Sequence, residues 1–189
     1  DYARISDSWP RSNPRGFARW FEGRAALGRN GGLLETRASV ENVPPYEWKT
    51  TLQRVIQFLK RHRDVMFNKP EIADLAPISM IITNLAANAY EGETDIWLAL
   101  RNIVSRMPNF VNAQKPRVPN PADPAEDYAD KWSREPRLEE YFRLWMQQLQ
   151  ADVEALPLVL EDASERYRTK SAFAIELSEG DLGRFASSR

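Results

Sequence analysis

Residues 51–66 read TLQRVIQFLKRHRDVM, and residues 77–90 read PISMIITNLAANAY. In the first stretch the apolar residues recur at the spacing of one helical face: Leu52, Val55, Ile56, Leu59 and Met66. The opposite face holds Gln53, Gln57, Lys60, Arg61 and Asp64. The second stretch opens with Pro77, which suits a first helical turn, and its apolar face holds Ile78, Ile81, Ile82 and Leu85. Two consecutive helices are therefore predicted, with Lys60 pointing away from the core.

The junction of these two predicted helices has the features of an anion site. Lys60 lies toward the end of the first helix, and Ser79 lies in the first turn of the second. Free backbone N–H groups and the helix dipole favour an anion at a helix N-terminus. A lysine ammonium adds a compact positive charge with three donors. The junction therefore predicts a site for the phosphates of a nucleotide.

Proline and polar residues mark the expected helix ends elsewhere. Asn13 before Pro14 predicts the start of a short aromatic helix. Thr94 is expected to cap a later helix that Pro108 ends, and Asp123 is expected to cap another. No alternation of strands and helices is visible, so the fold class is predicted to be mainly α, a helical bundle lobe with short extended segments.

The last part of the chain is expected to be a long helix followed by a tail. The helix begins after Pro136, and Pro157 is expected to kink or restart it. A short strand is possible at 172–177. The chain is thus divided into a connecting segment with one short helix (1–50), a helical nucleotide-binding lobe (51–170) and a tail (171–189).

Composition excludes several functions. The formal net charge of −1 argues against strong duplex nucleic-acid binding by general charge neutralisation. Cysteine is absent and His62 is the single histidine, which excludes disulfides and thiolate metal sites and makes a structural zinc site untenable. The absence of cysteine leads us to expect a cytoplasmic location. No apolar run is long enough to span a membrane, and no charged-then-apolar signal segment opens the sequence.

Four segments together resemble one family. They are SNPRGFARWF (12–21), LQRVIQFLKRHRDVMF (52–67), PISMIITNLAANAY (77–90) and VPNPADPAEDYADKW (118–132). In this order they resemble the C-terminal helical half of cGAS/DncV-like nucleotidyltransferases, the bacterial relatives of cyclic GMP-AMP synthase and oligoadenylate synthase. The resemblance implies an enzyme that joins nucleoside triphosphates such as ATP and GTP into cyclic oligonucleotide messengers in anti-phage defence, alongside defence-system partner proteins.

The family's catalytic groups have no match in this sequence. The resemblance implies a sheet lobe with a Gly-Ser turn and three acids that bind Mg²⁺, placed before the SNP segment. No Gly-Ser pair occurs here, and no Asp-x-Asp follows an apolar strand. We therefore expect this chain to be a fragment without its N-terminal catalytic lobe, to bind no metal itself, and to make no cyclic product alone.

The resemblance also implies roles for particular residues. Lys60 matches a helix lysine that contacts the triphosphate, and Ser79 matches a polar residue on the same nucleotide. The alternatives are that Lys60 pairs with Asp64 and that Ser79 is an ordinary capping serine. The weaker candidates for nucleotide binding are Arg61, Arg63 and Thr83, for which solvent-exposed, surface-paired or intrahelical roles remain open.

Other chemically suggestive residues are given structural roles. Glu91, Glu93 and Asp95 precede a predicted helix and are interpreted as dipole-capping residues rather than metal ligands. His62 is expected to pack at a helix edge rather than act in acid–base chemistry. Asn120 and Asp123 are interpreted as structural. Core packing is expected for Trp20, Trp97, Trp132 and Trp145, while Trp9 and Trp48 are left unassigned.

Two other function classes remain. A non-catalytic helical protein-interaction module is the general alternative for an all-α chain without a nucleophile or metal motif. An RNA-cleaving helical toxin would need an arginine four to six residues before a histidine. Arg54 and His62 do not have that spacing, so this alternative is disfavoured.

Overall fold

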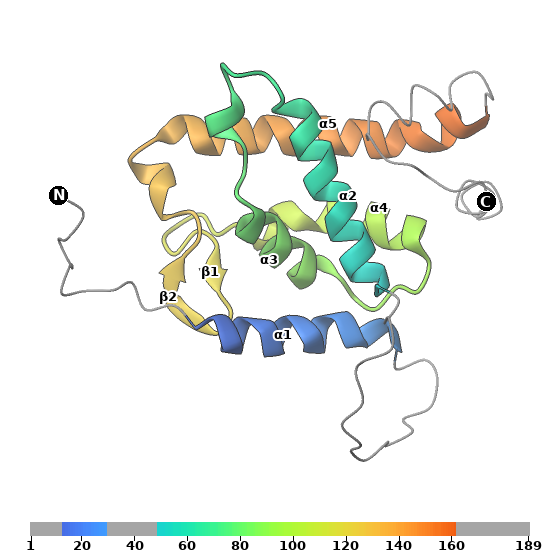
Figure 1. Ribbon diagram of the computed structural model, residues 1–189, viewed down its shortest axis with the longest axis horizontal. Coiled ribbons are helices and arrows are strands. Elements are labelled where there is room, and N and C mark those ends of the chain that lie inside the picture. The colour runs from blue at the N-terminus through green and yellow to red at the C-terminus, as the bar shows by residue number, and fades with distance from the viewer. Residues whose placement is uncertain (1–12, 30–48, 162–189) are drawn as a thin grey trace, which may run out of the picture.

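The computed structural model describes residues 13–29 and 49–161, and helices make up most of these residues. The α-helices are α1 (Pro14–Ala26), α2 (Thr51–Met66), α3 (Ser79–Ala89), α4 (Ile96–Arg106) and α5 (Pro136–Glu161). Short 3-10 turns occur at Leu27–Arg29, Ala73–Leu75, Met107–Phe110 and Asp130–Ser133. Helix α1 lies along one side of the lobe and α5 along the opposite side, with α2, α3 and α4 between them (Figure 1). The predicted mainly α fold is confirmed.

Side chains cap three of the helices as their sequences suggest. Asn13 Oδ1 accepts a hydrogen bond of 2.9 Å from the Gly16 N–H, and Pro14 occupies the first turn of α1 as predicted. Thr50 and Gln53 form a reciprocal capping box at the start of α2. Asp95 caps α4 by accepting from the Leu98 N–H at 2.7 Å. The prediction that Thr94 would cap this helix was wrong by one residue, because the aspartate carboxylate takes the free N–H.

The start of α3 differs from the prediction. The helix begins at Ser79 rather than at Pro77, and Ile78 is the N-cap residue in extended conformation. Pro77 is buried, whereas the Ile78 side chain is 52% exposed. Placing Ile78 on the buried face was therefore wrong, because an extended residue before a helix does not follow the helical periodicity. No side chain caps α3.

A small antiparallel hairpin replaces the helix expected at Asp123. Strand β1 (Pro119–Asn120) pairs with β2 (Asp123–Asp127), with Asn120 opposite Asp123. The Asn120 side-chain oxygen accepts from the Ala122 N–H at 2.9 Å, an interaction that stabilises the turn. The Asp127 carboxylate accepts from the backbone N–H groups of Arg117 and Val118 and holds the segment extended. Asp123 as a helix cap was therefore wrong.

Helix α2 occupies the middle of the core. It packs against α3, α4 and α5. Four of the five apolar residues predicted for its inner face are buried and Met66 is half-buried: Leu52, Val55, Ile56 and Leu59 are at most 4% exposed. Trp132 and Trp145 are buried as predicted, while Trp20 and Trp97 are half-buried against the core.

Helix α5 is continuous over 26 residues. It does not restart at Pro157 and is described as far as Glu161. The possible strand at 172–177 and the tail at 171–189 lie outside the described residues, as do Trp9 and Trp48.

Helix α1 is joined to the end of α3 by one arginine. Arg24 donates hydrogen bonds to the backbone carbonyls of Ala87, Asn88 and Tyr90. Carbonyls in the last turn of a helix have no intrahelical donor, and a cation there also interacts favourably with the helix dipole. Arg24 therefore holds α1 on α3 at the end opposite to Ser79.

Among the described residues, no helix combines the length and the apolar composition needed to cross a membrane.

Candidate functional site

Lys60 projects from the polar face of α2 and is half-buried. Burial lowers the pKa of its ammonium, and the nearby positive charge of Arg63 lowers it further, while Asp64 acts in the opposite direction. No carboxylate among the described residues lies within ion-pair distance of Lys60, and Asp64 pairs with Arg63 instead, at 2.7 Å. The alternative in which Lys60 is held by Asp64 is therefore not seen.

Arg63 links the end of α2 to the start of α3. Its Nη1 donates to the Pro77 carbonyl at 2.9 Å and to Ser79 Oγ at 3.2 Å. Its Nε and Nη2 donate to Asp64 Oδ1 at 2.9 and 2.7 Å. The side chain is 15% exposed. Arg63, a weaker candidate from the sequence, therefore makes direct contact with Ser79.

Ser79 is exposed at the uncapped first turn of α3. This turn carries no acidic residue. Its free N–H groups therefore lack both a side-chain acceptor and a local negative charge, which leaves the positive end of the helix dipole uncompensated. Because Arg63 of α2 contacts Ser79, this turn is next to the face of α2 that holds Lys60.

The other two candidates are less closely placed. Arg61 is exposed on α2, and Thr83 is half-buried one turn after Ser79 on α3. Within residues 13–29 and 49–161, no side-chain hydrogen bond joins Thr83 to Lys60, Arg63 or Ser79. The junction cluster, defined here as Lys60, Arg63 and Ser79, is thus the part of the predicted site that the fold brings together.

Comparisons with known proteins bear on the family and the fold of this chain. No model of a known protein family matches the chain. An alignment over 147 residues is 35% identical to the c-di-GMP synthase of Roseivirga ehrenbergii, and the match covers 72% of this chain and 37% of that protein. The chain is a relative of the cGAS/DncV-like nucleotidyltransferases. It spans a little over a third of the length of the curated relative that it matches.

A solved structure shares the fold of this chain. The Bradyrhizobium diazoefficiens CD-NTase CdnG, in complex with GTP, superimposes with a TM-score of 0.56 at 21% sequence identity. The match covers 86% of this chain and 54% of that chain. The helical arrangement of Figure 1 is therefore an arrangement found in a CD-NTase.

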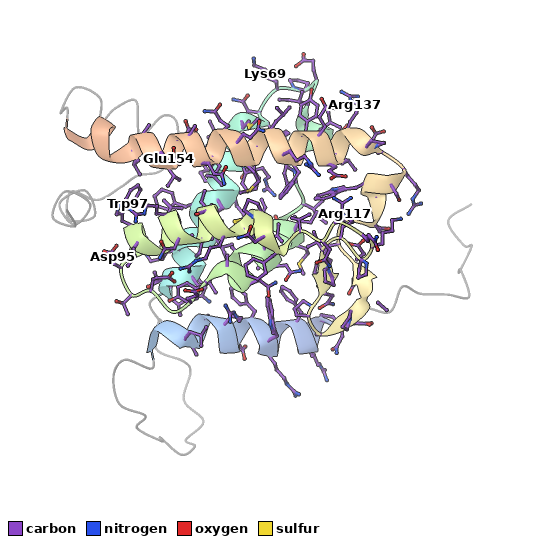
Figure 2. The ribbon with its side chains drawn as sticks, turned by 180° about the vertical axis from the view of Figure 1, so that it is seen from behind. Lys69, Asp95, Trp97, Arg117, Arg137 and Glu154 are labelled. Atoms are coloured by element: carbon purple, nitrogen blue, oxygen red, sulfur yellow. The ribbon has the colours of Figure 1, made fainter. Side chains whose placement is uncertain are left out.

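The acidic run Glu91, Glu93 and Asp95 does not fit a metal ion. Asp95 caps α4, where Figure 2 labels it, and Glu91 pairs with Arg106 at 2.9 Å. Burial alone would raise the pKa of Glu93, but hydrogen bonds from Asn102 and neighbouring backbone together with the Arg106 charge lower it. Glu91 and Glu93 thus pair with Arg106 instead of interacting with the dipole of α4. No group of three or more possible ligands in the described ranges could hold a metal.

His62 is buried rather than placed at a helix edge. Its side chain is 4% exposed, because α2 and α5 pack together around it. The Trp145 Nε1–H donates to His62 Nδ1 at 3.1 Å, so Nε2 carries the proton and donates to Asp152 Oδ2 at 2.9 Å. Both ring nitrogens are therefore engaged in holding α2 on α5, which leaves neither for acid–base chemistry.

Sequence reasoning missed a groove beside the start of α3. Its volume is about 470 Å³, and its lining includes Ile78, Asp123, Glu126, Tyr128 and Asp130. Burial, together with the Glu126 carboxylate, raises the pKa of Tyr128 to about 12. The acidic lining opposes an anion here, so a phosphate is directed toward the basic side of Ser79. The residues were visible in the sequence, but the predicted helix at Asp123 placed them wrongly.

Proposed function

We propose that this chain is the substrate-holding helical lobe of a nucleotidyltransferase that makes cyclic nucleotide messengers, and that the junction cluster binds the triphosphate. The observation that carries the proposal is the position of Lys60. It is half-buried, has no ion-pair partner in the described part of the chain, and lies near Arg63, which in turn contacts Ser79 at the uncapped start of α3. Such a group is suited to binding an anion.

The electrostatics of the cluster support the proposal. Burial and a neighbouring like charge both disfavour a charged lysine. A phosphate placed between Lys60 and the first turn of α3 would relieve this cost, because it supplies an opposite charge and acceptors for the free N–H groups. The site is therefore better suited to an anion than to a neutral ligand.

The relatives suggest which nucleotide to test first. One is named a c-di-GMP synthase and the other is a CD-NTase in complex with GTP, so GTP is the first ligand to test here and ATP the second. Magnesium-dependent bond formation is expected of the N-terminal catalytic lobe that the resemblance implies. The role in anti-phage defence and its partner proteins stays a prediction from the resemblance.

Calorimetric titration of the chain with GTP tests the phosphate site. We expect binding in the millimolar range or tighter, and about a 10- to 100-fold loss of affinity in Lys60→Ala, which is the range for a hydrogen bond to a charged group. Lys49→Ala, which removes an exposed lysine before α2, serves as the matched control and is expected to bind as the wild type does.

The same titration separates the two candidate functions. Equal affinity of the Lys60→Ala and wild-type chains would contradict the phosphate site. Absence of GTP and ATP binding at millimolar concentration would favour the helical protein-interaction module instead.

The pH dependence of GTP affinity provides a second prediction. The pKa of Lys60 lies below its ordinary value of 10.5, because of burial first and the Arg63 charge second. Phosphate binds the protonated amine, so affinity is full below this lowered pKa and falls as pH rises through it. We expect this fall to begin at lower pH than for an ordinary lysine.

Lys60→Arg, which stays charged, should give a flatter profile between pH 8 and 10, the range over which affinities are measured. Identical profiles would contradict a charge contact by Lys60.

A further inference from the structure

Arg63 is held on three sides before any ligand arrives. Asp64 accepts from its Nε and Nη2, the Pro77 carbonyl accepts from Nη1, and Ser79 Oγ accepts from the same Nη1. These bonds engage most of the N–H donors that a guanidinium carries. The Asp64 carboxylate also offsets part of its charge. Arg63 is therefore better placed to fix its neighbours than to grip a ligand itself.

The Arg63 contact determines how the Ser79 hydroxyl can be used. A hydroxyl has one proton to donate and lone pairs that accept, and here a lone pair is engaged by Arg63 Nη1. No acceptor for the Ser79 hydroxyl proton is found within the described residues. The proton therefore points away from the guanidinium, toward solvent at the exposed start of α3.

We propose that Arg63 is a positioning residue that fixes the Ser79 hydroxyl as a hydrogen-bond donor toward the bound phosphate. This inference rests on the proposed function, because it concerns the same site. It also identifies the kind of group that meets Ser79: a hydrogen-bond acceptor, such as a phosphate oxygen, rather than a base amine, which only donates. The dipole of α3 favours negative charge at that point.

A double-mutant cycle measured by GTP affinity tests the coupling. We expect Ser79→Ala and Arg63→Ala each to weaken GTP binding by about 5- to 10-fold. The double variant should be no more than about 10-fold weaker than the wild type, because without the hydroxyl Arg63 has nothing to position. Independent effects would multiply to at least about 25-fold, and that result would overturn the proposal.

Arg63→Lys separates positioning from charge. Lysine keeps the positive charge but lacks the planar fork that bonds Asp64, Pro77 and Ser79 together. We expect its affinity for both GTP and inorganic tripolyphosphate to resemble that of Arg63→Ala. Recovery of wild-type affinity would overturn the proposal in favour of a simple charge effect. Arg101→Ala, an exposed arginine on α4, is the control for loss of a surface charge.

Each variant is first checked for folding by circular dichroism. If Arg63→Ala does not fold, Arg63→Lys replaces it in the cycle with Ser79→Ala. Failure of the wild type to bind GTP or tripolyphosphate would overturn both this inference and the proposed function. Binding that is lost in Lys60→Ala, together with multiplicative Arg63 and Ser79 effects, would overturn this inference alone.

Discussion

Trp145→Ala is expected to lower the free energy of unfolding by about 4 kcal/mol, within the range for removing a buried tryptophan. Trp145 is fully buried, and its ring lies 6.0 Å from that of Phe142 and 6.4 Å from that of His62, measured between centroids. The substitution removes this packing and also leaves His62 Nδ1 without its donor. Urea unfolding at neutral pH measures the change.

Trp145→Phe separates packing from hydrogen bonding. Phenylalanine keeps an aromatic ring but has no Nε1–H, so it leaves the buried His62 Nδ1 unsatisfied at a cost of about 1–3 kcal/mol. Leu144→Ala, a 43% exposed neighbour on α5, is the control and is expected to change stability by less than about 0.5 kcal/mol. Wild-type stability of Trp145→Phe would show that the His62 bond contributes nothing.

Residues that follow a local pattern were predicted well. The helical spacing of Leu52, Val55 and Leu59 placed the buried face of α2 correctly, because amphipathic periodicity reflects the one face that a helix turns to the core. The His62–Trp145 bond lay beyond this reasoning. Its partners are 83 residues apart, and no local pattern indicates which α5 residue lies against α2.

Two Asx-Pro sequences show where local signals fail. Asn13-Pro14 starts a helix, whereas Asp123-Pro124 lies in a strand. Both have a capping residue before a proline, so the local signal is the same. The second is held extended because Asp127 accepts from backbone N–H groups nine and ten residues earlier, around Arg117. A non-local interaction therefore overrides a favourable capping sequence there.

The candidate site also combines residues that a local pattern indicates with one whose role depends on the tertiary fold. Lys60 and Ser79 stand out because each occupies a recognisable position in a helix, and the fold places their elements together. The role of Arg63 depends on reaching the Pro77 carbonyl and Ser79 Oγ across the α2–α3 connection. Its charge is evident from the sequence, but the direction of its guanidinium is set by tertiary packing.

Arg117 was given no role from the sequence, yet it joins the hairpin to α5. It lies between these elements in Figure 2, donating to both Glu139 oxygens at 3.2 and 2.6 Å and to the Asn112 carbonyl at 2.5 Å. Its guanidinium also lies 5.6 Å from the centroid of the Trp132 ring. A bidentate, largely buried pair with cation–π support is a stronger restraint than a surface ion pair.

We expect Arg117→Met to lower the free energy of unfolding at pH 7 by about 2–3 kcal/mol, because it removes charge-assisted hydrogen bonds while keeping an apolar stem over Trp132.

Hydrogen bonding by Arg117 is the main cause that holds the Glu139 pKa below its usual 4.5. A carboxyl with a depressed folded-state pKa stabilises the fold above its unfolded pKa and loses that contribution as pH falls through the folded value. Wild-type stability should therefore decline below about pH 4.5. The variant should lose less over the same range, because Arg143 alone remains at 2.7 Å to sustain the depression. Urea unfolding at pH 7 and pH 3.5 measures both effects, and Arg134→Met, which breaks an exposed pair with Asp130, is the matched control. Parallel pH profiles for wild type and Arg117→Met would contradict the assignment of this acid sensitivity to the Arg117–Glu139 pair.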